Sequence, residues 1–252
     1  MLTMRWGSAT DVGRVRRVNE DNLFVSPALF AVADGMGGHA AGEVASTLAI
    51  GGVAALAGAD EPRVEDLVAA IAAINEQILL VGREHPDQAG MGTTLSGIAV
   101  SSVEGKPHWA VFNVGDSRVY RYSESTLRQL TVDHSAVQEL IEAGEITDED
   151  ARHHPLRHVV TRSLGSSPAP EPDVALYEAL AGERFLVCSD GLTNELRDAE
   201  IAQVLAVSTD PQQAAEELVR RANQAGGRDN STVIVLDLVE DSEPDRLPQG
   251  AL

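Results

Sequence analysis

Cysteine and basic residues are both scarce in this 252-residue sequence, and each shortage excludes a class of protein. The single cysteine, Cys188, excludes an internal disulfide framework and any zinc or iron–sulfur site built from several cysteines. Nineteen Lys and Arg residues against 39 Asp and Glu residues leave a net charge of −20. This charge argues against nucleic acid or an anionic membrane as the main partner, because both attract clustered Lys and Arg.

Long hydrophobic runs are also missing. No stretch of 18 apolar residues occurs, and the N-terminal residues lack the apolar core of a signal peptide. Together with the lone cysteine, these features lead us to expect a cytoplasmic protein without a membrane partner. The most linker-like stretch is the acidic C-terminal end, EDSEPDRLPQGAL. We therefore expect one domain over residues 1–239 and a disordered acidic tail over residues 240–252.

The distribution of apolar residues predicts an α+β protein. Apolar runs bounded by turn residues predict strands at residues 3–9, 23–26, 29–33, 94–100, 108–114, 117–122, 184–189 and 231–238. Helical spacing and Ala-rich composition predict helices at residues 42–56, 65–84, 135–143, 198–206 and 212–224. Strands that follow one another, instead of alternating with helices, favour α+β. Residues 133–165 are polar and are predicted to form an insertion over the surface.

Acidic residues stand at the ends of five of these predicted strands. They are Asn19-Glu20-Asp21, Asp34-Gly35, Gly115-Asp116, Asp190-Gly191 and Arg228-Asp229. An Asp-Gly pair after a strand usually forms only a turn, in which the glycine takes a positive φ angle. Five acidic elements in equivalent places favour instead a common site at one edge of a sheet.

Such a site would require bound cations. Two carboxylates ~4 Å apart repel each other by ~4 kcal/mol at an effective dielectric constant of ~20. The candidate ligands are all oxygen atoms, which favours Mg²⁺ or Mn²⁺ over zinc. Two ions that share a bridging carboxylate are typical of hydrolysis at phosphorus, in which they stabilise the attacking and leaving oxygens.

Other local patterns carry weaker hypotheses. The glycine-rich segment FAVADGMGGHAAGE could be a nucleotide-binding loop, but Ala40 occupies the position of the third glycine in GxGxxG. The histidines of ARHHPLRH, residues 151–158, could bind zinc, although no fourth ligand is evident. Cys188 lies in an apolar run, which indicates a buried structural thiol.

Seven motifs in order resemble the metal-dependent protein serine/threonine phosphatases, the PPM or type-2C family, in its bacterial form. They are GRVRRVNED (13–21), ADGMGGHAAGE (33–43), MGTT (91–94), NVGDSR (113–118), the segment from DHS (133–135) to RSLG (162–165), CSDGL (188–192) and GGRDNSTV (226–233). The resemblance implies a four-layer αββα sandwich, with two antiparallel sheets flanked by helices. It also implies that the insertion near residues 133–165 is a flap beside the active site.

The resemblance implies two Mn²⁺ or Mg²⁺ ions at one end of the sandwich, and in bacterial relatives often a third. Asp34 would bridge two ions, and the carbonyl oxygen of Gly35 would bind one of them. Asp190 and Asp229 would bind the first ion. Asp116, together with Asp190, would bind the third.

Four further residues gain roles from the resemblance. Glu20 and Asp21 would hold metal-bound waters or bind a metal directly. Arg16 occupies the phosphate-binding position, where its guanidinium can donate two parallel hydrogen bonds. His39 aligns with the proposed general acid, and an imidazole can protonate a serine alkoxide leaving group.

These roles imply a protein serine/threonine phosphatase that uses a metal-activated hydroxide and forms no phosphoenzyme. The expected partners are phosphorylated proteins, among them substrates of bacterial Ser/Thr kinases and the kinases themselves, and we expect a monomer. Two alternatives remain open. The same fold could act on an anti-sigma-factor antagonist, or it could be a catalytically inert module that binds phosphoproteins.

Overall fold

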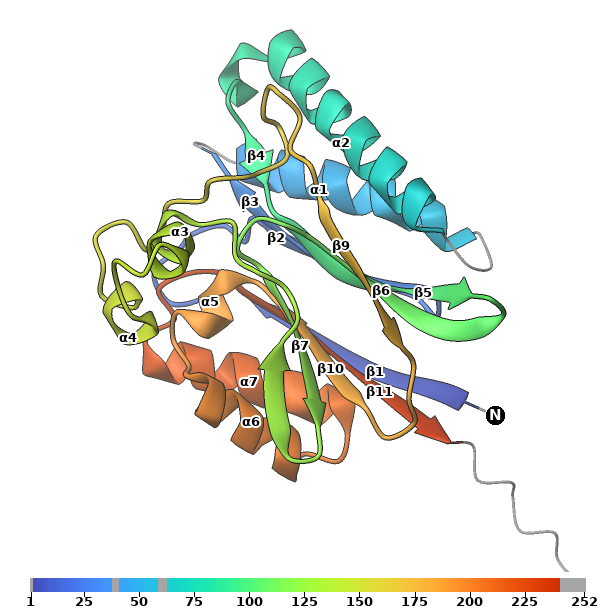
Figure 1. Cartoon of the computed structure of the whole chain (residues 1–252). Coiled ribbons are helices and arrows are strands. Elements are labelled where there is room, and N and C mark those ends of the chain that lie inside the picture. Colours follow the sequence, from blue (N-terminus) through green and yellow to red (C-terminus); the bar gives the residue numbers. More distant parts are fainter. Residues whose placement is uncertain (1, 38–40, 59–62, 241–252) are drawn as a thin grey trace, which may run out of the picture.

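Two antiparallel sheets pack face to face in the computed structural model, which describes residues 2–37, 41–58 and 63–240 (Figure 1). The first sheet has the order β1 (Leu2–Asp11), β11 (Ser231–Glu240), β10 (Arg184–Cys188), β7 (Arg118–Ser123) and β8 (Thr126–Gln129). The second has the order β2 (Asp21–Val25), β3 (Leu29–Met36), β5 (Leu95–Val103), β6 (Lys106–Val114) and β9 (Asp173–Glu178), and β4 (Gly92–Thr93) pairs with β3.

Helices cover the outer face of each sheet, which confirms the four-layer αββα sandwich (Figure 1). The second sheet is covered by α1 (Ala41–Ala54) and α2 (Val64–Glu84), and the first by α6 (Asp198–Val207) and α7 (Pro211–Ala225). The remaining helical elements are short: α3 (Ala136–Glu142), α4 (Asp148–Ala151), α5 (Asp190–Thr193) and the 3₁₀ turns Ala55–Gly58 and Pro86–Gln88. The sequence predicted every long helix to within two residues, and it did not predict β4, β8, β9, α4 or α5.

The local sequence explains where these helices lie. In α2 the buried side chains Leu67, Ile71, Ile74 and Ile78 recur every three or four residues, so one stripe of the helix faces the sheet. At the start of α7, the Asp210 side chain accepts hydrogen bonds from the next backbone N–H groups, and a proline follows it at the first helical position. The packing of α2 and the start of α7 therefore follow from their local sequences.

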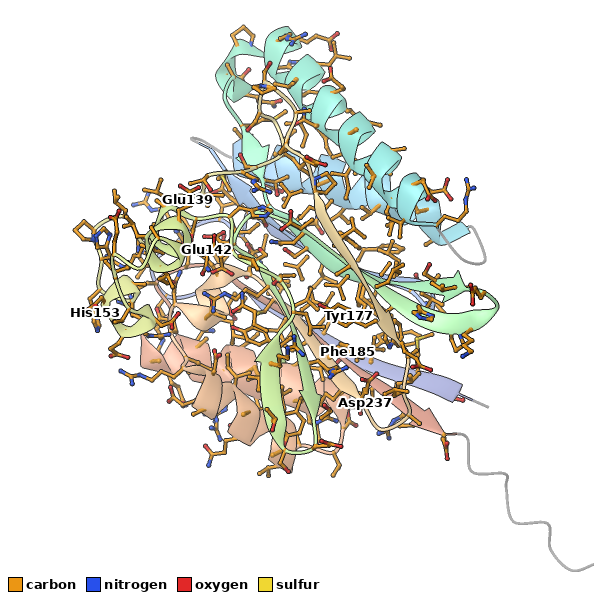
Figure 2. The ribbon with its side chains drawn as sticks, viewed as in Figure 1. Glu139, Glu142, His153, Tyr177, Phe185 and Asp237 are labelled. Carbon is orange, nitrogen blue, oxygen red and sulfur yellow. The ribbon has the colours of Figure 1, made fainter. Side chains whose placement is uncertain are left out.

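The central strands are apolar on both sides because both of their faces are buried. In β3, Ala31 and Ala33 face the helices, while Phe30 and Val32 face the other sheet. Between the sheets, the rings of Trp109 and Phe185 meet edge to face with centroids 5.4 Å apart. Figure 2 shows Phe185 and Tyr177 in this inter-sheet layer.

Cys188 is buried at the end of β10, as the sequence predicted. Burial raises the pKa of its thiol to about 12, so the group remains a neutral thiol at physiological pH. Its burial supports the predicted structural role.

The two Asp-Gly pairs are not turns, contrary to the usual interpretation of such pairs. Strand β3 continues through Asp34 and Gly35, and Gly191 lies inside α5. Their glycines are required by close backbone contacts. A Cβ on Gly35 would lie 2.1 Å from the carbonyl oxygen of Gly42, and one on Gly191 would lie 1.8 Å from that of Asn230.

The predicted insertion, residues 133–165, is the flap, and it carries α3 and α4 (Figure 1). Its middle is exposed, but its two ends are buried rather than lying over the surface. His134 and Leu164 are buried, and they bond to the backbone of Gly115 and Thr93. The flap is therefore anchored at both ends beside the loops that carry the acidic residues.

Of the predicted tail, Glu240 is the last residue of β11, and residues 241–252 lie outside the described residues. Within the described part of the chain, no helix is long and apolar enough to cross a membrane.

Candidate metal centre

The predicted acidic residues meet at one end of the sandwich. Asp21 and Asp34 are paired opposite each other on β2 and β3. The Ser189 hydroxyl, at the end of β10, donates a hydrogen bond of 2.7 Å to Oδ2 of Asp21 and so joins the two sheets. Asp34 and Asp190 line the same cavity. Three strand ends thus bring three carboxyl groups into one small volume.

A cavity of about 690 Å³ opens above these groups. Eight of the residues to which the sequence gave a role in metal or phosphate binding are described by the structure, and seven of them line this cavity. The seven are Arg16, Glu20, Asp34, Gly35, Asp116, Asp190 and Asp229. The eighth, Asp21, lies opposite Asp34 on the neighbouring strand and does not line the cavity. His39 lies outside the described residues.

Burial and mutual repulsion raise the pKa values of these carboxyl groups. Burial raises the pKa of Asp34 well above its usual range, and the negative charges of Asp21 and Asp190 raise it further. Burial likewise raises the pKa of Asp21 to about 7, and that of Asp116 well above normal. For Asp190, burial and the charge of Asp229 raise the pKa. Cations bound among these groups would remove the repulsion.

The donor set fits hard divalent cations. Oδ1 of Asp21 is buried and has no hydrogen-bond partner among the described residues, which leaves a carboxylate oxygen available to a cation or its water. Within residues 2–37, 41–58 and 63–240, no group of three or more His, Cys, Asp or Glu side chains is already arranged to hold a metal ion. The fit therefore rests on this oxygen and on the oxygen-only chemistry of the neighbouring groups, and the zinc hypothesis for residues 151–158 gains no support.

Two threonines of the MGTT motif hold Asp34 in place. The backbone N–H of Asp34 donates to Oγ1 of Thr94 at 2.9 Å, and its carbonyl oxygen accepts from Oγ1 of Thr93 at 2.9 Å. Thr94 also shares a hydrogen bond of 2.8 Å with Ser117, next to Asp116. The sequence contained this motif, but nothing in its spacing revealed that it supports a carboxylate.

Asn230 organises the loop that carries Arg16 and Glu20, and sequence reasoning missed it. Its Oδ1 accepts a hydrogen bond from the Glu20 backbone N–H at 2.9 Å. Its Nδ2 donates to the carbonyl oxygens of Val12 and Val18, at 3.0 Å each. One side chain thus fixes both ends of the loop, next to Asp229 in the sequence. The only signal was an amide residue directly after a candidate ligand.

A buried histidine fixes the loop before Asp116. The backbone N–H of Gly115 donates to Nδ1 of His134 at 3.1 Å, and the His134 backbone N–H donates to the Gly115 carbonyl oxygen at 2.9 Å. Nε2 of His134 lies 3.2 Å from a carboxylate oxygen of Asp173. Since Nδ1 accepts, the ring proton is on Nε2 and is donated to Asp173.

Arg16 lies at the rim of the cavity, beside the acidic groups. Its Nη2 is 2.7 Å from Oδ2 of Asp229, and about half of its side chain is exposed. This hydrogen bond raises the pKa of the Arg16 guanidinium, which is charged in any case. A fixed positive charge therefore lies next to the candidate metal ligands, so a phosphate group in the cavity could contact Arg16 and bound metal ions together.

Residues 15–229 match the family description of protein phosphatase 2C. The chain belongs to the protein phosphatase 2C family. It is 40% identical over 242 residues to the serine/threonine protein phosphatase PstP of Mycobacterium tuberculosis. That match covers 95% of this chain and 46% of PstP, so the chain spans about half the length of that relative. It is 39% identical to the serine/threonine phosphatase stp of Listeria welshimeri, covering 90% of this chain and 93% of that one.

Solved structures of the family share the fold over nearly all of this chain. The M. tuberculosis PstP/Ppp phosphatase superposes with a TM-score of 0.88 at 40% identity, covering 94% of this chain and 99% of that structure. The catalytic domain of PstP in complex with two manganese ions gives a TM-score of 0.86 at 39% identity, covering 95% and 100%. The protein phosphatase 2C family is metal-dependent, in agreement with the acidic cluster described above.

Proposed function

We propose that this protein is a protein serine/threonine phosphatase that depends on Mn²⁺ or Mg²⁺. The observation that carries the proposal is the group of carboxyls gathered at one end of the sandwich, with raised pKa values and below a cavity with Arg16 at its rim. The names of its family relatives, PstP and stp, support the same activity. We propose residues 1–239 as the catalytic domain.

The metal ligands that we propose are Glu20, Asp21, Asp34, Gly35 through its carbonyl oxygen, Asp116, Asp190 and Asp229. When bound, two ions would lower the pKa of a shared water so that it can attack phosphorus near neutral pH. Two strands and the start of α5 hold the central carboxyl groups of this set, which keeps them in fixed positions. The manganese complex of the related PstP domain supports two ions, and Asp116 would contribute to a third.

Arg16 and His39 complete the proposed site. Arg16 would hold the substrate phosphate, and its place at the cavity rim supports this role. His39 would protonate the leaving serine or threonine oxygen, an assignment that rests on the family resemblance alone. With an activated water as the nucleophile, no phosphorylated side chain is needed.

The substrates that we propose are phosphoproteins, including those made by Ser/Thr kinases. We propose further that the protein acts as a monomer in the cytoplasm, where its one free thiol would stay reduced. An inert phosphoprotein-binding module is less well supported, because all six predicted acidic ligands are at the site. Action on an anti-sigma-factor antagonist would use the same site and differ only in the substrate.

Release of phosphate from phosphoserine and phosphothreonine peptides tests the proposal. We expect turnover with Mn²⁺ or Mg²⁺, none in EDTA, and recovery when the metal is restored. Full turnover in EDTA would refute the metal-dependent site. Binding of the peptides without release of phosphate would favour the inert module instead.

A further inference from the structure

One wall of the cavity carries basic side chains that the proposed metal chemistry does not use. Arg152, His153, Arg157 and His158 all line the cavity, and all come from the part of the flap that follows α4. Figure 2 shows His153 on this part of the flap, away from the inter-sheet core. Because the whole chain carries a charge of −20, four basic side chains within seven residues form a local exception. We call these four residues the flap wall.

Most arginines at the cavity are already neutralised by a carboxylate. Three of the five have such a partner within 3.0 Å: Arg16 with Asp229, Arg197 with Glu149, and Arg228 with Glu195. Arg152 and Arg157 differ, because they donate only to the backbone carbonyl oxygens of Thr193 and His154, at 3.3 Å each. Among the residues that the structure describes, neither forms an ion pair. These two charges are therefore available to a ligand.

The same two arginines stand where two hollows meet. A neighbouring hollow of about 420 Å³ runs from Asp116 and Asp190 toward α6, and Arg152 and Arg157 line it as well. An extended peptide advances ~3.3 Å per residue. If the phosphoserine is held above the proposed metal ligands, the residues on one side of it would therefore pass the flap wall.

From this arrangement we infer that Arg152 and Arg157 select substrates in which acidic residues flank the phosphoserine or phosphothreonine. The inference rests on the proposed function and adds a substrate class to it. A guanidinium can donate two parallel hydrogen bonds to a carboxylate. The second hollow is also lined by carboxylates, but Asp133 and Glu149 are paired with Arg118 and Arg197. Arg152 and Arg157 have no carboxylate partner among the described residues, so they are the groups with which an acidic segment gains a favourable contact.

Matched phosphopeptides test the inference. Three phosphothreonine peptides of equal length carry Glu, Gln or Lys on both sides of the phosphothreonine, and kcat/KM is measured with saturating Mn²⁺. Partly exposed ion pairs contribute modestly, so for the wild type we expect the Glu peptide to exceed the Gln peptide about fivefold, which corresponds to ~1 kcal/mol. Raising the NaCl concentration to 0.5 M should reduce this preference, because salt screens exposed charges.

Variants of the flap wall assign the preference to its two arginines. The double variant Arg152→Gln/Arg157→Gln should lose the preference for Glu while it keeps turnover of the Gln peptide, and Arg152→Lys/Arg157→Lys should retain most of it. Arg83→Gln serves as the matched control, because Arg83 is an exposed arginine on α2 that lines neither hollow. It should behave as the wild type.

The outcomes separate this inference from the proposed function. Equal kcat/KM for the Glu and Gln peptides in the wild type would overturn the inference and leave the phosphatase proposal intact. So would a Gln double variant that keeps the preference. A protein that hydrolyses none of the three peptides would overturn the proposed function and this inference with it.

Discussion

Replacing Asn230 by alanine should damage both the stability and the active site of the protein. The side chain is 5% exposed and makes three hydrogen bonds, to the backbone of Glu20, Val12 and Val18. A hydrogen bond contributes ~1 kcal/mol net, and partners left unsatisfied in a buried position cost at least as much. The expected loss is therefore about 3 kcal/mol, a large share of the ~5–15 kcal/mol that stabilises a typical domain.

Asn75 offers a matched control for this loss. It is a buried asparagine on α2 that also makes three hydrogen bonds, to the backbone of Gly165 and Ser166. Asn75→Ala should lower the free energy of unfolding by a similar ~3 kcal/mol. Neither Asn75 nor its partners line the metal cavity, so the activity of this variant should stay close to that of the wild type.

Only Asn230→Ala should affect catalysis. Its loop positions Arg16, and a displacement of ~1 Å at a reacting site can lower a rate ~10²-fold. We expect kcat/KM for a phosphopeptide to fall at least tenfold, measured at a temperature where urea unfolding shows that both variants are folded. If Asn230→Ala loses stability as Asn75→Ala does but keeps kcat/KM within twofold, the loop does not depend on Asn230 for its catalytic position.

Four further outcomes can be measured. The single variants Asp34→Asn, Asp190→Asn and Asp229→Asn should keep their fold, as judged by circular dichroism. Each should retain less than about a tenth of the wild-type kcat, a loss above ~1.4 kcal/mol in transition-state stabilisation. Arg16→Ala should raise KM about 10–100-fold and change kcat less, because a phosphate contact acts in both ground and transition states; a fall in kcat alone would contradict this. His39→Gln should slow phosphopeptide hydrolysis ~10²–10⁴-fold but p-nitrophenyl phosphate hydrolysis far less, and equal losses would exclude a general acid. Asp237→Ala removes a buried carboxylate that accepts two hydrogen bonds from Arg184, at 2.6 and 2.8 Å, and should cost ~3–5 kcal/mol in urea unfolding with kcat unchanged.

The long elements of the fold could be predicted from the sequence because their signals are local. Continuous apolar runs gave the central strands, and apolar residues at helical spacing gave α2. Strands β8 and β9 were not predicted, because they lie at the edges of their sheets, where few of their side chains are buried and the apolar pattern is weak. The pairing order of the strands is a property of contacts between distant segments, and only the structure supplied it. The family resemblance implied no more than two antiparallel sheets flanked by helices.

The carboxylates of the candidate site could also be predicted, since a row of acidic residues at strand ends has few structural explanations. Their supports could not. Asn230, Thr94 and His134 act through bonds to backbone atoms that lie up to 218 residues away in the sequence. Such partners leave no spacing pattern, because a hydrogen bond to the backbone requires no particular side chain at the other end.

The sequence by itself determined that this protein has an acidic, oxygen-only site at strand ends and a two-sheet fold of a known family. The tertiary structure decided which of those acidic residues lie together at one cavity and which side chains hold them there. It also decided that the glycines of the two Asp-Gly pairs serve close packing, at Gly35 and Gly191, and not turns. The physical reason is that burial, repulsion between carboxylates and the fit of one backbone against another depend on distances through space, which the order of residues along the chain does not contain.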